Sequence, residues 1–336
     1  MYEAFFGVEK CPFSMTPDPG SLYLTEGHRE AIAGLNYAIM QRKGFVVLAG
    51  EAGTGKTTLL RKLMEMLPES DVITSVVLNP LLTPREFMEL LMLDFGIAAP
   101  PRSKARRLTR LAQTLIEAHA SGKSAVLFVD EAHKLTYELL EEIRLLTNFE
   151  TSNQKLLQIV LAGQPELIDL LNRRELWQLK QRIAIRLQTH PLSREQVVKY
   201  IAHRWSRAGG RDPAPFTEDA VSLIALKSLG IPRLINAICD NALLFAFGAG
   251  TRTIGPRLIG EVVRDLDLDR WTPPTAPAAP SAVATAAEGA WTSGPPPMLN
   301  PAAESADEWA GARAARSVRT SIETSFVKTE TEPVRS

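Results

Sequence analysis

The sequence is poor in cysteine, with only Cys11 and Cys239 among 336 residues. Two cysteines are too few for a disulfide framework, and neither has a second cysteine or a histidine at the spacing of a zinc site. We therefore expect a protein of a reducing compartment that does not depend on a cysteine-bound metal.

Net charge and long apolar runs are also missing. The 38 basic residues balance the 38 acidic ones, so total charge gives no argument for a nucleic-acid or membrane partner. Apolar runs such as Ala125–Val129 and Ala242–Gly250 are far shorter than the roughly 18 residues that span a bilayer. The N-terminus lacks the basic start and apolar core of a signal peptide. We expect a cytoplasmic protein in which any charged partner is recognised by a local patch.

The length predicts about two domains, and 45% hydrophobic residues are enough for a sizeable core. The composition changes in the last fifth of the chain. Residues 271–336 contain 15 Ala and 9 Pro but only seven Leu, Ile, Val or Phe, too few to offset the entropy of ordering the backbone. We predict a disordered Ala/Pro-rich tail over 271–336.

Strand-like apolar segments alternate with amphipathic helical segments in the first part of the chain. The predicted strands are Phe45–Ala49, Val72–Leu78, Ser124–Val129 and Leu156–Ala162. This alternation is typical of an α/β fold with a parallel sheet covered by helices on both faces. Thr83 and Glu86 also predict a capping box at the start of one helix. After Pro191 only helices are predicted, so we expect an α/β domain over 1–190 and a helical lid over 191–270.

A glycine-rich segment follows the first predicted strand and precedes a helix. It reads Gly50-Glu51-Ala52-Gly53-Thr54-Gly55-Lys56-Thr57, followed by Thr58. This is the P-loop pattern GxxxxGK[ST], in which glycines let successive backbone N–H groups approach a phosphate. We expect Lys56 to contact the β- and γ-phosphates and the Thr57 hydroxyl to ligate Mg²⁺. The segment predicts nucleotide binding.

Two carboxylates end the third predicted strand, which is the arrangement of a Walker B motif. We expect Asp130 to hold the Mg²⁺ and Glu131 to polarise the attacking water. Together with the P-loop, this pair predicts hydrolysis of a nucleoside triphosphate. His133 follows closely, and either an exposed capping role or a catalytic role fits the sequence.

A polar amide, Gln164, follows the fourth predicted strand. Since the ends of parallel strands gather at the ligand crevice, Gln164 could reach the γ-phosphate or the attacking water. The alternative is that Gly163-Gln164-Pro165 is only a strand-to-helix turn. Asn148, at a predicted helix end, is a competitor for the same role.

Three arginines are candidates for contacting a phosphate. Arg182 and Arg186 lie just before the lid, where a guanidinium could reach the nucleotide of a neighbouring subunit. Basic residues near a helix end could instead complement its dipole. Arg233 lies in the first turn of a lid helix, where a cation is disfavoured unless it meets an anion such as the γ-phosphate.

A basic cluster lies at the start of the helix predicted over Ser103–His119. Its five cations are Arg102, Lys104, Arg106, Arg107 and Arg110. Such a cluster could contact the phosphate backbone of DNA. A solvated helix face is the more common explanation, since aromatic residues for base stacking are absent nearby.

The motifs together resemble the ExeA-like ATPases, also called general secretion pathway protein A, over about residues 1–268. The resemblance is carried by Tyr2–Gly7, Pro12–Pro19, the P-loop, Asp130–His133, Leu145–Glu150, Gly163–Leu167 and Gly230–Arg233. It implies an AAA+ fold, ATP as the nucleotide, Gln164 as sensor 1, Arg233 as sensor 2 and Arg182 as an arginine finger. It also implies that the segment through Pro19 and His28–Arg29 borders the adenine.

The resemblance leads to two functional hypotheses for an oligomeric, ATP-dependent switch. One is an ATPase for secretion, export or envelope assembly that acts on an unidentified protein partner. The other is a DNA-bound regulator like the related ATPases of Tn7-like transposition. Secretion-type members continue into a transmembrane helix, whereas residues 271–336 contain no candidate span, so we expect a chain without one.

Overall fold

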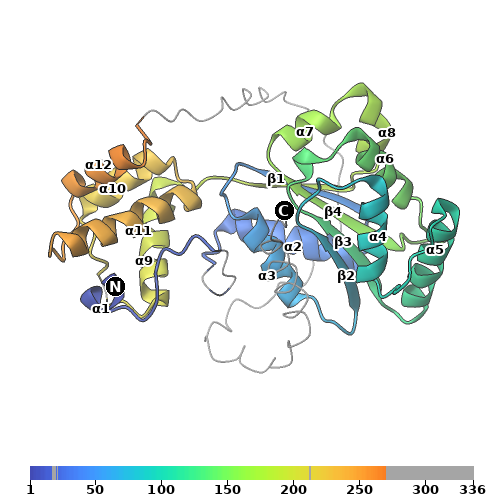
Figure 1. Ribbon diagram of the computed structural model, residues 1–336, viewed down its shortest axis with the longest axis horizontal. Helices are drawn as coiled ribbons and strands as arrows, with labels where there is room; N and C mark the ends of the chain where they lie inside the picture. Colours follow the sequence, from blue (N-terminus) through green and yellow to red (C-terminus); the bar gives the residue numbers. More distant parts are fainter. Residues whose placement is uncertain (17–19, 21, 212, 270–336) are drawn as a thin grey trace, which may run out of the picture. The chain divides into compact units, whose positions relative to one another are not determined.

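The computed structural model describes residues 1–16, 20, 22–211 and 213–269. All of them belong to one unit of the chain, which is drawn in colour in Figure 1. The tail predicted over 271–336 lies outside the described residues. Among the helices that are described, none is long and apolar enough to cross a membrane.

The centre of the α/β part is a parallel sheet with the strand order β2-β3-β4-β1-β5. Its strands are β1 (Phe45–Gly50), β2 (Val72–Val77), β3 (Ser124–Val129), β4 (Leu157–Gly163) and β5 (Ile185–Thr189). Every residue of β1, β3 and β4 is buried, which explains why these segments are apolar except at Ser124 and Gln158. The predicted fold class is confirmed.

The fifth strand, β5, pairs in parallel with β1 at the edge of the sheet, and the sequence did not reveal it. It has five residues, and the first four alternate between half-buried and exposed positions, so it lacks the apolar run of a central strand. Arg186 is one of the exposed residues of this strand. The interpretation of Arg186 as a residue near a helix end is therefore wrong.

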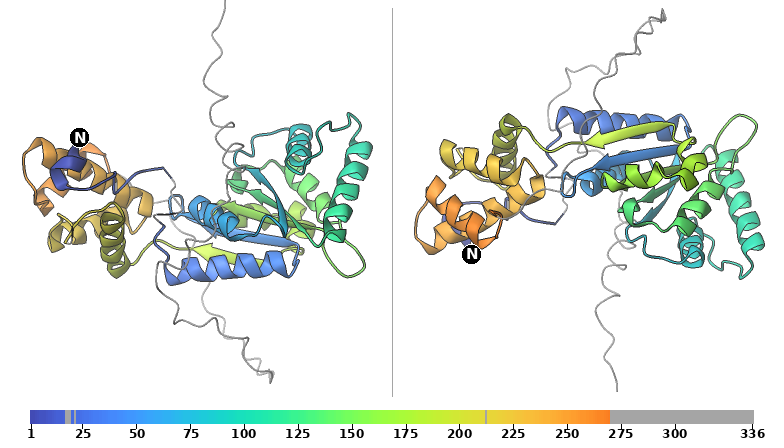
Figure 2. Two further views of the ribbon diagram at one scale, coloured as in Figure 1. Left: turned by 90° about the horizontal axis from the view of Figure 1, so that it is seen from below. Right: turned by 90° about the horizontal axis from the view of Figure 1, so that it is seen from above.

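Helices cover both faces of the sheet. They are α2 (Glu26–Met40), α3 (Lys56–Met66), α4 (Pro84–Asp94), α5 (Lys104–Ala120), α6 (Tyr137–Leu146), α7 (Glu166–Leu171) and α8 (Trp177–Lys180). Figure 2 shows α2 on one side of the sheet and α4 and α5 on the other. Each face has its own apolar core, one with α2 and α3 and one with α4 to α8. The predicted capping box of Thr83 and Glu86 is present at the start of α4.

A third apolar core lies among α9 (Arg194–Arg207), α10 (Glu218–Ser228), α11 (Pro232–Gly248) and α12 (Pro256–Asp265). The N-terminal helix α1 (Tyr2–Phe6) contributes to this core and not to the cores of the sheet. The Phe5 ring packs edge-on against Phe247 at 5.5 Å, and the Tyr2 hydroxyl donates to Asp240. The two ends of the described chain therefore share one core, whereas the domain boundary near 190 stays a prediction.

Candidate nucleotide site

The strand order brings the predicted functional segments to one edge of the sheet. The P-loop follows β1, Asp130 follows β3, and Gln164 follows β4, which lies between β1 and β3. Parallel strands present their carboxyl ends at the same edge, where ligands of open α/β sheets bind. The sequence prediction for these three segments is thus consistent with the topology.

The P-loop glycines are required by the backbone and by close packing. Gly53 and Gly55 have φ of 79° and 95°, in the left-handed region that favours glycine. A Cβ on Gly53 would lie 2.7 Å from the Cβ of Arg233, at the start of α11. The backbone N–H of Arg233 also donates to the Gly53 carbonyl at 3.3 Å. The loop is therefore in direct contact with the first turn of α11.

The Lys56 ammonium is buried in the loop, where it donates to the carbonyls of Gly50 at 2.7 Å and Glu51 at 2.9 Å. An ammonium has three N–H donors, so one remains for a phosphate oxygen. Burial lowers the pKa of Lys56, and the nearby carboxylates of Asp130 and Glu131 oppose this shift. Those carboxylates therefore favour the charged form that a phosphate needs.

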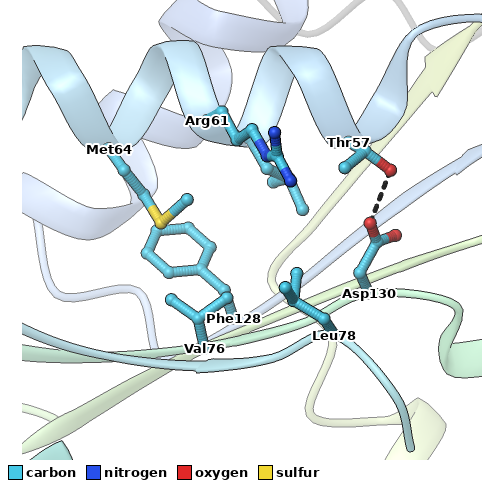
Figure 3. Close-up of a pocket in the computed structure, with 8 residues that line it drawn as sticks. Thr57, Arg61, Met64, Val76, Leu78, Phe128 and Asp130 are labelled. Atoms are coloured by element: carbon cyan, nitrogen blue, oxygen red, sulfur yellow. Dashed lines mark hydrogen bonds between the residues drawn. The ribbon is translucent and has the colours of Figure 1, made fainter. Parts of the chain in front are cut away.

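The Thr57 hydroxyl donates to Asp130 Oδ2 at 2.6 Å, as Figure 3 shows. The other carboxylate oxygen of Asp130 accepts from the backbone N–H of Glu131 at 2.8 Å. In the described part of the chain, no group of three or more His, Cys, Asp or Glu residues could hold a metal ion. Mg²⁺ needs no such group, because it typically takes one or two protein oxygens together with phosphate oxygens and water. The Thr57 and Asp130 oxygens fit that requirement.

A small pocket adjoins this pair between α3 and the ends of β2 and β3 (Figure 3). Its walls are mainly apolar and include Val76, Leu78 and Phe128, with the guanidinium of Arg61 on the α3 side. Apolar walls leave the Asp130 carboxylate with few competing polar neighbours on this side.

Glu131 adopts a left-handed backbone with φ of 50°, which costs a non-glycine residue about 1 to 3 kcal/mol. Its Oε2 lies 3.3 Å from Lys134 Nζ and 3.6 Å from His133 Nε2. The His133 side chain is only 12% exposed, so the interpretation as an exposed capping residue is wrong. The strained backbone directs the residue after Asp130 away from the strand axis.

Gln164 contacts the same histidine. Its backbone N–H donates to His133 Nδ1 at 3.4 Å, and its side-chain amide lies 3.2 Å from His133 Nε2. Gln164 also lines the cleft described below. Asn148 is an exposed residue just after α6 and is absent from the lining of that cleft. Of the two amides, Gln164 is the one at the site.

A cleft of about 590 Å³ lies beside the P-loop, within the usual range for small-molecule sites. Residues from Ala52 to Thr58 form one wall, together with Glu131 and Gln164. The opposite walls come from the N-terminal segment and the helical part: Ser14, Met15, Thr16, Leu22, Tyr23, His28, Leu192, Tyr200, Arg204, Pro232, Arg233 and Asn236. The expected position of the N-terminal segment and His28 beside the P-loop is consistent with this lining.

Several of these lining residues were not predicted from the sequence. The Tyr200 hydroxyl donates to Asn236 Oδ1 at 2.8 Å, and Asn236 donates to the Ser14 carbonyl at 3.4 Å. Arg204 is buried and donates to the carbonyls of Pro12 at 2.7 Å and Ser14 at 3.1 Å. The segment that lines the cleft is thus held by α9 and α11, through contacts between residues about 190 to 220 positions apart.

Comparison with known proteins agrees with this geometry. A family model described as "AAA domain" matches residues 39–171. These residues are an AAA+ domain. General secretion pathway protein A of Aeromonas hydrophila is 44% identical over 255 residues, which cover 76% of this chain and 46% of that protein. The predicted resemblance to that family is confirmed, although the chain spans less than half of the relative's length.

Two further similarities extend beyond the AAA+ domain. The ATP-dependent target DNA activator B of Escherichia phage Mu is 26% identical over 258 residues, 75% of this chain and 76% of that protein. Among solved structures, the Aeropyrum pernix ORC1 protein in complex with DNA superposes with a TM-score of 0.59 at 17% identity, over 78% of this chain and 70% of that one. At this identity, the structural likeness establishes the AAA+ fold alone.

The three candidate arginines have different positions relative to the AAA+ site. Arg233 lines the cleft and is exposed. Arg182 is half-buried after α8, where its Nη1 donates to Thr147 Oγ1 at 2.6 Å, and it is absent from the cleft lining. Arg186 is exposed on β5 and does not line the cleft either. Only Arg233 is close to the nucleotide site of its own chain.

The basic cluster of α5 is only partly available to a partner. Arg107 is buried and its Nη1 pairs with Glu89 at 3.3 Å, while Lys104 forms an ion pair with Glu142. Within the described residues, the exposed members that form no ion pair are Arg102, Arg106 and Arg110. Four of the five candidate contacts to DNA are therefore exposed, and one of these, Lys104, already forms an ion pair.

Proposed function

We propose that the chain is an ATPase that binds ATP with Mg²⁺ in the cleft and hydrolyses it. The observation that carries the proposal is the 2.6 Å contact between Thr57 and Asp130 beside the buried Lys56 ammonium. These groups place a cation and two hard oxygens beside the P-loop, with the Glu131 carboxylate on the next residue. Mg²⁺ bound by Thr57 and Asp130 would neutralise phosphate charge there.

The protein groups have separate tasks in this proposal. The P-loop N–H groups and the remaining Lys56 donor bind the phosphates, because they form a preorganised set of positive dipoles and charge. Glu131 orients the attacking water and accepts its proton, since its carboxylate directly follows the proposed Mg²⁺ ligand Asp130. Gln164 donates to the γ-phosphate or the water from the end of β4, and Arg233 contacts the phosphate from the side of α11.

The ATPase would act as an oligomeric switch in the cytoplasm, with the helical lid over 191–270 responding to the nucleotide. We assign Arg182 the role of an arginine finger toward the nucleotide of a second copy, because it does not line the cleft of its own chain. The 44% identity to general secretion pathway protein A favours a role in secretion, export or envelope assembly through a protein partner.

Phosphate release and nucleotide binding measured on three variants test the ATPase proposal. Lys56→Ala should abolish both, because it removes the phosphate-binding cation. Glu131→Gln should bind ATP, hydrolyse it at least 100-fold more slowly and accumulate as oligomers. Lys62→Ala, at an exposed ion pair on the same helix, is the matched control and should behave as wild type. Normal ATP binding by Lys56→Ala would contradict the proposal.

A DNA-bound ATP-dependent regulator is the second candidate. It is favoured by the similarity to the target DNA activator of phage Mu, which extends over 76% of that protein. In this version, Arg102, Arg106 and Arg110 contact the DNA backbone. Arg106→Glu with Arg110→Glu should then weaken binding to duplex DNA at low salt and remove any DNA stimulation of the ATPase. Arg257→Glu, at an exposed position of α12, is the control. Unchanged sedimentation of the wild type with DNA would reject this candidate.

A further inference from the structure

The imidazole of His133 contacts both Glu131 and Gln164, two groups to which the proposed function gives different tasks. Its Nδ1 accepts from the Gln164 backbone N–H at 3.4 Å, so a neutral ring carries its proton on Nε2. Nε2 lies 3.2 Å from the Gln164 side-chain amide and 3.6 Å from Glu131 Oε2. Because amide oxygen and nitrogen are assigned from such networks, the rotated amide offers its oxygen to this N–H.

The backbone fixes the ring in this position. His133 lies in a short 3₁₀ turn that begins after Glu131, with Ala132 fully buried beneath it. The backbone N of His133 lies 3.1 Å from where a Cβ on Gly163 would be. The turn can approach the end of β4 this closely because Gly163 has no side chain. The His133 side chain is only 12% exposed, so its ring has few other orientations available.

The two carboxylate oxygens of Glu131 have different contacts. His133 and Lys134 both face Oε2, at 3.6 Å and 3.3 Å. Oε1 is left to accept a proton from water. At 3.6 Å the His133 Nε2–H lies just beyond hydrogen-bond distance of Oε2, so a small movement of either side chain closes the bond. A carboxylate fixed in this way loses fewer orientations when it meets the water, which is the usual gain from an outer positioning group.

We propose that His133 is a positioning residue that orients the Glu131 carboxylate and couples its orientation to Gln164. The inference rests on the proposed ATPase function and adds a third member to its hydrolytic group. When the Gln164 amide turns toward a γ-phosphate, it no longer contacts His133 Nε2–H. Glu131 is then the one remaining acceptor for this N–H among the two. The end of β4 thus transmits the presence of the phosphate to the residue that activates water.

Two substitutions separate positioning from a structural role. His133→Asn keeps an acceptor near the place of Nδ1 but has no donor that reaches Glu131. His133→Gln extends an amide N–H toward the place of Nε2. We expect His133→Asn to lower kcat by about 10- to 100-fold with the nucleotide Kd unchanged. His133→Gln should recover most of that loss, and His190→Asn, the same change at an exposed histidine, should be neutral.

A double variant tests the coupling to Gln164. If the amide acts through His133, the kcat losses of Gln164→Leu and His133→Asn should not multiply in the combined protein. Thermal unfolding of each variant checks that the fold is retained. Equal losses in His133→Asn and His133→Gln, weaker nucleotide binding in both, or unchanged kcat in His133→Asn would overturn the inference. A wild type without turnover sensitive to Lys56→Ala would instead overturn the proposed function itself, and the inference with it.

Discussion

Replacing Gly53 by alanine tests the contact between the P-loop and α11. The change forces an L side chain into a left-handed backbone with φ of 79°, which costs about 1 to 2 kcal/mol. The new Cβ would also lie 2.7 Å from the Cβ of Arg233 and 3.0 Å from Cγ2 of Ile231. The Cβ of Arg233 is fixed by the helix backbone and cannot rotate away, so overpacking adds about 1 to 3 kcal/mol.

Gly55→Ala is the matched control for this prediction. Gly55 has a similar backbone, with φ of 95°, but its added Cβ would meet only His28 Nε2 at 3.8 Å. The two variants therefore share the backbone cost and differ in the clash. Urea unfolding followed by circular dichroism should show Gly53→Ala less stable than Gly55→Ala by about 1 to 3 kcal/mol. Equal stability of the two variants would refute the close approach of α11 to the loop.

Two further predictions concern buried charge. Arg107→Ala should lower the free energy of unfolding by about 1 to 3 kcal/mol, because it removes a buried side chain; Glu89 loses its 3.3 Å contact but keeps its ion pair with Arg85. Arg106→Ala, at an exposed position, should change the free energy of unfolding by less than about 0.5 kcal/mol. Chemical denaturation compares the two variants, and equal effects would contradict the burial of Arg107. Burial lowers the pKa of His28, so the unfolded state binds a proton more tightly than the folded state does. The free energy of unfolding should therefore fall as the pH drops below about 6.5. Between pH 7.5 and 5.5, the free energy of unfolding should fall less steeply with decreasing pH in His28→Gln than in wild type, by up to about 1.4 kcal/mol per pH unit. His190→Gln should keep the wild-type dependence on pH. The same dependence in all three proteins would reject the prediction.

The chemistry at the strand ends could be predicted from the sequence because it is encoded locally. Lys56 and Thr57 follow a strand and open a helix, and Asp130 ends an apolar run, so pattern and position agree. The edge strand β5 could not be predicted in the same way. Its side chains alternate, and only its pairing with β1 distinguishes it from a loop.

Contacts between distant parts of the chain account for the other differences. The packing of Tyr2 and Phe5 on α11 and the contacts of Tyr200 with the cleft depend on tertiary structure that no local pattern records. Arg107 is a different case, because a signal was present. It lies four and eight positions before Leu111 and Leu115, on the buried face of α5, so helical periodicity separates it from Arg106 and Arg110.

The packing of α1 on the C-terminal helices has a practical consequence for measuring conformational change. Met1 precedes a helix that is fixed to α11 by Tyr2 and Phe5, so a fluorophore attached to the first residue moves with residues 194–265 and not with the sheet. Paired with a second dye on α2 or α5, it would report the distance between the α9–α12 helices and the sheet without a label on those helices. A tag placed at the N-terminus is likewise attached to the helical part, and deletion of the first dozen residues would expose part of its apolar core.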